Sequence, residues 1–347
     1  MGKPRIMSNF LTIFSPIFLL LAVAGDALCD TPPSTGRFVY EATPNPMGAR
    51  SSLSGDGKVF TSAGSARISV WRRSTNTKLF EICCFAPGSS LYTRHFILGE
   101  YENFGIAIIK NDDIGVVTFT GYGPDGSSDF EAKVGANFEE LNYSLNRRKD
   151  RLYFWDSNNL WAYSKGAKTL KVYTTPWEDY SPDNVAFGEN DSVVAYNDGS
   201  NGFIKQQDKN GKVYGRVCEN LIASTRQYLS LDGSSNELLA LDEFGNSCYL
   251  KDGEEVFRTL DIGSNLRDIL LINNNIFILT GKSLAVYSKP DLNPISRITI
   301  DEIIEDIGIK KDRMYGFHSI GYDHTRDRFF VIGNGSTGMF FSVTYEE

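Results

Sequence analysis

The sequence lacks extended basic segments. Its 35 Lys and Arg residues are outnumbered by 43 Asp and Glu residues, which gives a formal net charge of −8 and a pI near 5.1. A negative protein is repelled by a phosphate backbone. We therefore expect no nucleic acid among the partners of this protein.

The sequence is also poor in residues that build metal and nucleophilic sites. Its three histidines, His95, His318 and His324, are scattered, and its five cysteines include no CxxC spacing. No serine lies in a GxSxG elbow, and the glycine-rich turns lead into predicted strands rather than into a phosphate-binding helix. We predict no metal site and no cofactor. Catalytic activity stays open, with a non-catalytic role favoured.

Long hydrophobic runs are absent beyond the N-terminus. An apolar stretch from Phe10 to Ala24 follows a basic start and precedes small residues, which is the pattern of a secretory signal. We predict a signal peptide over residues 1–29, a short linker over 30–36, and a secreted, extracellular protein with no membrane span after cleavage. Cleavage after Ala24 and an uncleaved anchor helix are the alternatives.

Cysteine is scarce, and cleavage after Cys29 leaves four. Cys83 and Cys84 are neighbours on a predicted strand, so their side chains point to opposite faces and do not pair with each other. A disulfide between Cys218 and Cys248 is the specific prediction, because an oxidising compartment permits it. Buried, unpaired thiols are the alternative.

What the sequence does contain is a repeat. Seven segments read as two short apolar strands around a turn rich in Gly, Asn, Asp and Ser, and they begin at positions 57, 104, 150, 191, 236, 275 and 327. Their spacing, between 39 and 52 residues, is that of a four-stranded propeller blade. We predict an all-β fold, a seven-bladed β-propeller over residues 37–347 as one domain, with six or eight blades as alternatives.

The last unit lacks a fourth strand because the chain ends at Glu347. The segment RFVYEA at 37–42 precedes the first complete unit and supplies the missing strand. A ring closed by this N-terminal strand leaves fewer exposed sheet edges.

The first unit, SGDGKVFTSAGSARISVW at 54–71, carries a family resemblance. It resembles the WD40-like and YVTN-type β-propeller superfamily, and the resemblance covers residues 37–347 as architecture. Trp71 is followed by Arg72 and not by Asp, and the units lack the Gly-His pair. The resemblance implies a ring with a central channel that serves as an interaction platform or, less often, as an enzyme.

Two sets of residues are binding candidates. Trp177 and Tyr180 lie in a connection between two prolines, where they offer apolar area to a partner; the alternative is that Trp177 fills the groove between blades. A second connection, 301–313, is expected to contain a short helix with solvated charges. The other candidates lead into or lie near the innermost strands around the channel: Arg226, Arg267, Asp268 and His318. They could bind a polar metabolite or a peptide end; the alternative is that they are the ordinary charge of a solvated channel.

Three N-x-S/T motifs occur, at Asn142, Asn190 and Asn334. Asn190 and Asn334 fall in predicted turns and are glycosylation candidates, whereas Asn142 falls in a predicted innermost strand and is expected to be bare.

We therefore expect a secreted, monomeric, non-catalytic propeller that binds an extracellular protein or glycan through its loops. A propeller hydrolase, lactonase or cyclase with a site at the channel mouth is the alternative.

Overall fold

The computed structural model describes most of the chain after residue 36. The described residues are 37–44, 51–63, 67–83, 93–146, 149–175, 177, 182–188, 193–197, 204–208, 213–221, 227–232, 237–242, 244–263, 266–307, 314–323, 328–335 and 339–346. They belong to one compact unit, residues 34–347.

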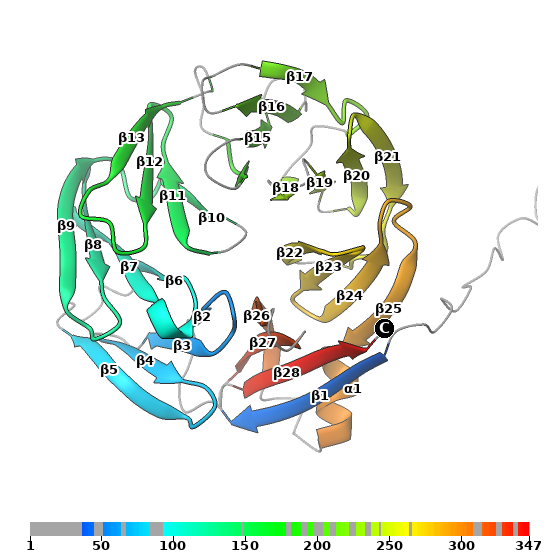
Figure 1. Cartoon of the computed structure of the whole chain (residues 1–347), viewed down its shortest axis with the longest axis horizontal. Helices are drawn as coiled ribbons and strands as arrows, with labels where there is room; N and C mark the ends of the chain where they lie inside the picture. The colour runs from blue at the N-terminus through cyan, green and yellow to red at the C-terminus, as the bar shows by residue number, and fades with distance from the viewer. Residues whose placement is uncertain are drawn as a thin grey trace, which may run out of the picture. The chain divides into compact units, whose positions relative to one another are not determined.

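The described strands form seven four-stranded antiparallel sheets, numbered here in chain order (Figure 1). Sheet 1 contains β2 (Ser51–Leu53), β3 (Val59–Ala63), β4 (Arg67–Arg72) and β5 (Thr77–Cys83). Sheet 2 contains β6 (Thr93–Leu98), β7 (Gly105–Asp113), β8 (Val116–Tyr122) and β9 (Ser128–Gly135), with a 3-10 turn at Tyr101–Asn103. Sheet 3 contains β10 (Asn142–Leu145), β11 (Arg151–Trp155), β12 (Asn159–Ser164) and β13 (Lys171–Thr174). Sheet 4 contains β14 (Val185–Phe187), β15 (Val193–Asn197), β16 (Ile204–Asp208) and β17 (Val213–Val217).

The remaining sheets follow the same plan. Sheet 5 contains β18 (Gln227–Asp232), β19 (Glu237–Asp242), β20 (Asn246–Lys251) and β21 (Glu254–Thr259). Sheet 6 contains β22 (Leu266–Ile272), β23 (Asn275–Thr280), β24 (Ser283–Ser288) and β25 (Pro294–Thr299). Sheet 7 contains β26 (Met314–Asp323), β27 (Arg328–Gly335), β28 (Met339–Glu346) and, as its outer strand, β1 (Arg37–Pro44).

Sheet 7 joins the two ends of the folded unit. β1 pairs with β28 in antiparallel register from Arg37 opposite Glu346 to Pro44 opposite Met339. The strand predicted from RFVYEA is therefore present and extends two residues further. Its pairing supplies the fourth strand of the last sheet (Figure 1, blue beside red).

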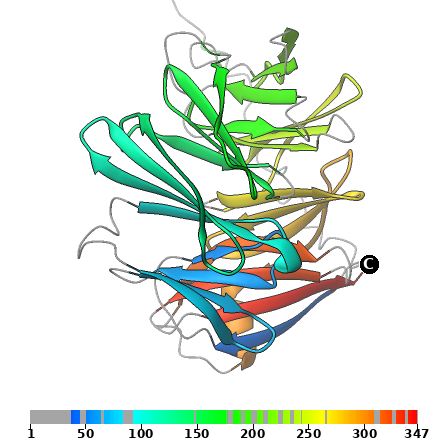
Figure 2. The ribbon, with the colours of Figure 1, turned by 60° about the vertical axis from the view of Figure 1, so that its left-hand side comes forward.

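The sheets follow one another around a common centre. The inner strands contact each other in cyclic order: β2 contacts β6, β10 contacts β14, β14 contacts β18, β18 contacts β22, β22 contacts β26, and β26 contacts β2, while β6 contacts β11. The second view, Figure 2, shows the sheets stacked face against face. The described strands therefore have the all-β, propeller-like arrangement predicted from the repeat.

Packing between neighbouring sheets explains why central strands such as β23 contain continuous apolar runs. In β23, Ile276 and Ile278 pack toward sheet 5, whereas Phe277 and Leu279 pack toward sheet 7. All six residues of this strand are buried. Because alternate side chains of a strand point to opposite faces, a strand covered on both faces reads as a continuous apolar run.

The predicted helix in the connection 301–313 is present as α1 (Ile300–Ile307). Thr299 and Glu302 form a capping box: the Thr299 N–H donates to Glu302 Oε2 over 2.7 Å, and the Glu302 N–H donates to Thr299 Oγ1 over 3.2 Å. Ile303 and Ile304 pack into the core between sheets 6 and 7, and the acidic side chains are exposed.

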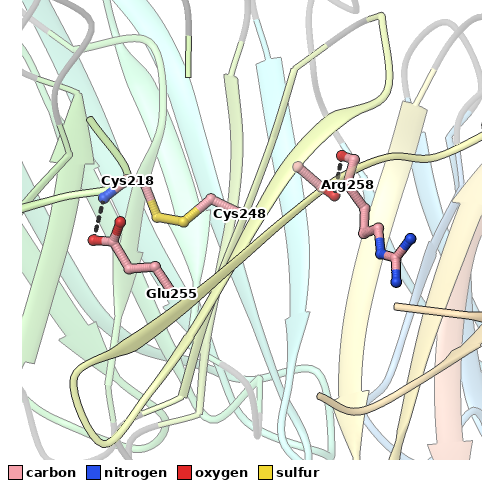
Figure 3. The surroundings of a disulfide bond; sticks show 5 residues. Cys218, Cys248, Glu255 and Arg258 are labelled. Atoms are coloured by element: carbon pink, nitrogen blue, oxygen red, sulfur yellow. Dashed lines mark hydrogen bonds between the residues drawn. A yellow bond between two sulfur atoms is a disulfide. The ribbon is translucent and has the colours of Figure 1, made fainter. Parts of the chain in front are cut away.

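A disulfide joins Cys218, which follows β17 of sheet 4, to Cys248 in β20 of sheet 5 (Figure 3). Both cysteines are fully buried, and their Cα atoms are 5.7 Å apart. The Cys218 N–H donates to Glu255 Oε1 of β21 over 2.8 Å, so the junction is also hydrogen-bonded. The covalent bond that the sequence suggested thus fastens two neighbouring sheets.

Replacing both bridged cysteines by alanine is expected to lower the free energy of unfolding by about 3 kcal/mol, because the bridge closes a loop of 30 residues in the unfolded chain. Urea unfolding of the double variant Cys218→Ala/Cys248→Ala measures this. Cys83→Ser is the matched control, since Cys83 is exposed and unpaired. Equal losses in the two proteins would contradict a stabilising role of the bridge.

Candidate functional site

The ring of sheets has two ends, which differ in the turns they carry. The upper end, as we name it, carries the turns between second and third strands and the connections between sheets. Hydrogen bonds link turns at this end to segments further along the chain. The Trp177 Nε1–H donates to the Asp156 carbonyl, and the Phe317 N–H donates to the Gly281 carbonyl. The lower end carries the turns between first and second strands.

Backbone hydrogen bonds link the lower turns of four sheets. The Tyr322 N–H donates to the Gly55 carbonyl, the Gly55 N–H to the Gly99 carbonyl, and the Gly99 N–H to the Lys149 carbonyl. The chain of bonds runs from sheet 7 through sheets 1 and 2 to sheet 3. These turns therefore form a connected rim at the lower end.

Lys149 extends from this rim across the centre of the ring. It lies in the turn between β10 and β11 with a φ of 51°, in the left-handed region that few non-glycine residues adopt. Its Nζ donates to the Ile320 carbonyl of β26 over 2.6 Å and lies 3.9 Å from Asp268 Oδ2 of β22. Sheet 3 is not a neighbour of sheets 6 and 7, so this one side chain connects three sheets through the centre.

The two strands that meet Lys149 are both irregular. The register of β22 shifts between Leu266 and Asp268, and that of β26 shifts between Phe317 and Ser319, around His318. Bulges redirect side chains and occur often beside functional sites. The sequence candidates Arg267, Asp268 and His318 therefore lie on the two bulged inner strands; Asp268 reaches the centre, and Arg267 is exposed.

Burial is the largest influence on the pKa values of Lys149 and Asp268. Burial lowers the pKa of the Lys149 ammonium, and the nearby Asp268 carboxylate opposes that shift. Burial raises the pKa of Asp268, and the Lys149 charge and the Ile269 N–H oppose that shift. Because the amine donates to a backbone carbonyl, its first role is to brace the ring. Within the described residues, no three His, Cys, Asp or Glu side chains gather to hold a metal.

The upper end carries exposed apolar side chains at the tips of two turns. Ile114, between β7 and β8, is 99% exposed, and Phe244, between β19 and β20, is 63% exposed. Both residues occupy the same position in their sheets, the turn between the second and third strands. Large apolar side chains at loop tips are typical of contact residues at interfaces.

The connections at the upper end are acidic. Among the described residues of these connections there is no Lys or Arg. The exposed acidic residues there are Glu139, Glu140, Asp183, Glu219, Asp261, Asp301, Glu302, Glu305 and Asp306. One of them, Asp261, pairs with Arg297 over 2.8 Å. The described connections at the end of the ring that carries the apolar tips are thus negatively charged, although exposed Lys282 and Arg267 also lie at that end.

The prediction that Trp177 offers apolar surface to a partner is wrong. The side chain is 4% exposed and packs with Trp155 of sheet 3 and with Phe187 and Tyr196 of sheet 4. Its Nε1–H donates to the Asp156 carbonyl over 3.2 Å. Trp177 fills the space between two sheets, which was the alternative reading of this residue.

The other sequence candidates have different outcomes. Tyr180, Arg226 and Asn190 lie outside the described residues. Asn334 lies at the end of β27, opposite Gly316, and not in a turn as predicted. Asn142 lies in the inner strand β10, as expected, and its Nδ2–H donates to the Pro182 carbonyl over 3.3 Å.

Sequence reasoning missed Lys149, Ile114 and Phe244. The turn residues around Lys149 give no sign that its side chain crosses the ring. Ile114 and Phe244 each stand before a glycine in a predicted hairpin turn, and an apolar residue in a tight turn is the signal that could have found them.

Comparison with known proteins finds no match, either to a protein-family model or to a curated protein sequence. In the described part of the chain, α1 is too short to cross a bilayer, and no other helix there is long and apolar enough.

Proposed function

We propose that this protein is exported and acts as a non-catalytic scaffold, with the seven sheets serving as the seven blades of one ring and its upper end binding an extracellular protein or glycan. The observation that carries the proposal is the pair of exposed apolar tips, Ile114 and Phe244, on equivalent turns of one end.

Two further features support the proposal. The buried Cys218–Cys248 bridge suits an oxidising compartment, in line with the secretory pattern of residues 1–29. The Lys149 side chain braces the ring centre, where a propeller enzyme would hold its substrate. Together they favour recognition at the turns over chemistry at the centre.

The test is binding to extracellular proteins and to a glycan array, with the double variant Ile114→Asp/Phe244→Asp compared with the parent protein. Losing two large apolar contacts is expected to weaken binding at least about tenfold. Val172→Asp is the matched control, since Val172 is 64% exposed but lies on the outer strand β13 of sheet 3. Equal binding by the double variant and the parent would refute the proposed surface.

A further inference from the structure

The Asp268 carboxylate at the ring centre has unused capacity to accept hydrogen bonds. Its Oδ1 accepts the Ile269 N–H over 2.9 Å, whereas Oδ2 lies 3.9 Å from Lys149 Nζ, beyond hydrogen-bonding distance. The side chain remains 32% exposed, so solvent reaches it. A carboxylate offers about four acceptor positions, and a partly buried one binds a cation more strongly than a surface one does.

Lys149 does not use this capacity fully. Its Nζ is 2.6 Å from the Ile320 carbonyl, and its side chain is 10% exposed. The ammonium is therefore held mainly by the backbone of β26, and its pairing with Asp268 is long and weak. A second cation in direct contact with Asp268 Oδ2 would gain a shorter bond than Lys149 makes.

The direction of approach follows from the two ends of the ring. The hydrogen-bonded rim of Gly55, Gly99 and Lys149 links turns at the lower end. Asp268 is the third residue of β22, and the first residues of an inner strand lie next to the upper end. The acidic connections there attract a positive group and raise its local concentration.

We propose that a lysine or arginine side chain of the partner enters the ring centre from the upper end and that the Asp268 carboxylate binds its cationic group. This inference rests on the proposed binding function and names the chemistry that the partner presents. Lys149 then has a second role, because its charge beside Asp268 competes with the incoming cation.

The experiment uses the chain without the predicted signal peptide, residues 30–347, and two probes that differ only in the ε-amino group: the tripeptide Gly-Lys-Gly with blocked termini, and the same peptide with norleucine in place of lysine. Binding is followed by calorimetry and by NMR shifts of backbone amides in β22. The parent protein is expected to bind the lysine peptide saturably and the norleucine peptide at least about tenfold more weakly.

Two variants make the test specific, because the proposal predicts opposite effects for them. Asp268→Asn is expected to weaken lysine-peptide binding about tenfold. Lys149→Met removes the competing charge and is expected to strengthen binding several-fold, measured at a pH high enough to keep Asp268 ionised, because loss of the Lys149 charge also raises the pKa of Asp268. A purely structural role of the pair would weaken binding in both variants. Thermal unfolding of each variant verifies that it is folded, and Lys149→Arg, which keeps the charge, is expected to bind as the parent does.

Equal binding of the two peptides, no saturable binding of the lysine peptide, or unchanged binding by Asp268→Asn would overturn the inference. Failure here is distinguishable from failure of the proposed function. A partner that depends on Ile114 and Phe244 but binds Asp268→Asn normally would refute the cation site and leave the upper-end surface intact.

Discussion

Deleting residues 37–44 is expected to destabilise the whole folded unit, lowering the free energy of unfolding by about 5 kcal/mol or more. The eight residues of β1 pair with β28 along their entire length, and each net hydrogen bond contributes about 1 kcal/mol. That loss is comparable with the total stability of many domains. It also leaves β28 as an unpaired edge that invites aggregation.

Urea unfolding followed by far-UV circular dichroism measures this effect. Deletion of residues 30–36 is the control, because the sequence indicates a linker there. Adding a synthetic peptide of residues 37–44 to the truncated protein is expected to restore part of the lost stability, since the strand can pair from solution. A truncated protein as stable as the parent would show that closure by β1 contributes nothing.

The closure strand was predictable because its evidence is local and repeated. Each sheet reads as short apolar runs separated by turn residues, and the last unit lacks a strand that RFVYEA can supply. A strand such as β23, NIFILT, is apolar from Ile276 to Leu279 because both of its faces are covered. Periodicity therefore predicts the sheets and their order.

The ring centre was only partly predictable because it depends on distant residues. Asp268 stood out by its place near the start of an inner strand, but Lys149 and Ile320 are separated by 171 positions and meet only when the ring closes. No local pattern encodes that contact. Likewise, prolines around Trp177 indicate a constrained loop but do not show whether the indole faces solvent or the neighbouring sheet.

Trp177→Ala is expected to lower the free energy of unfolding by about 3–5 kcal/mol, as for other large side chains removed from a core. The indole is buried between sheets 3 and 4, with ring centroids 6.1 Å from Trp155 and 5.9 Å from Tyr196. Truncation leaves a cavity and removes the partner of the Asp156 carbonyl.

Trp177→Phe separates these two contributions, because it keeps much of the ring packing and loses the Nε1–H donor; we expect it to cost about 1–2 kcal/mol. Ile114→Ala is the matched control, since Ile114 is almost fully exposed and its truncation is expected to stay within about 0.5 kcal/mol. In urea unfolding, we expect Trp177→Ala to lose the most free energy of unfolding, Trp177→Phe less, and the control Ile114→Ala the least. If Trp177→Ala cost no more than Ile114→Ala, the indole would contribute nothing to the joint between sheets 3 and 4, and the exposed binding role first inferred for it would have to be reconsidered.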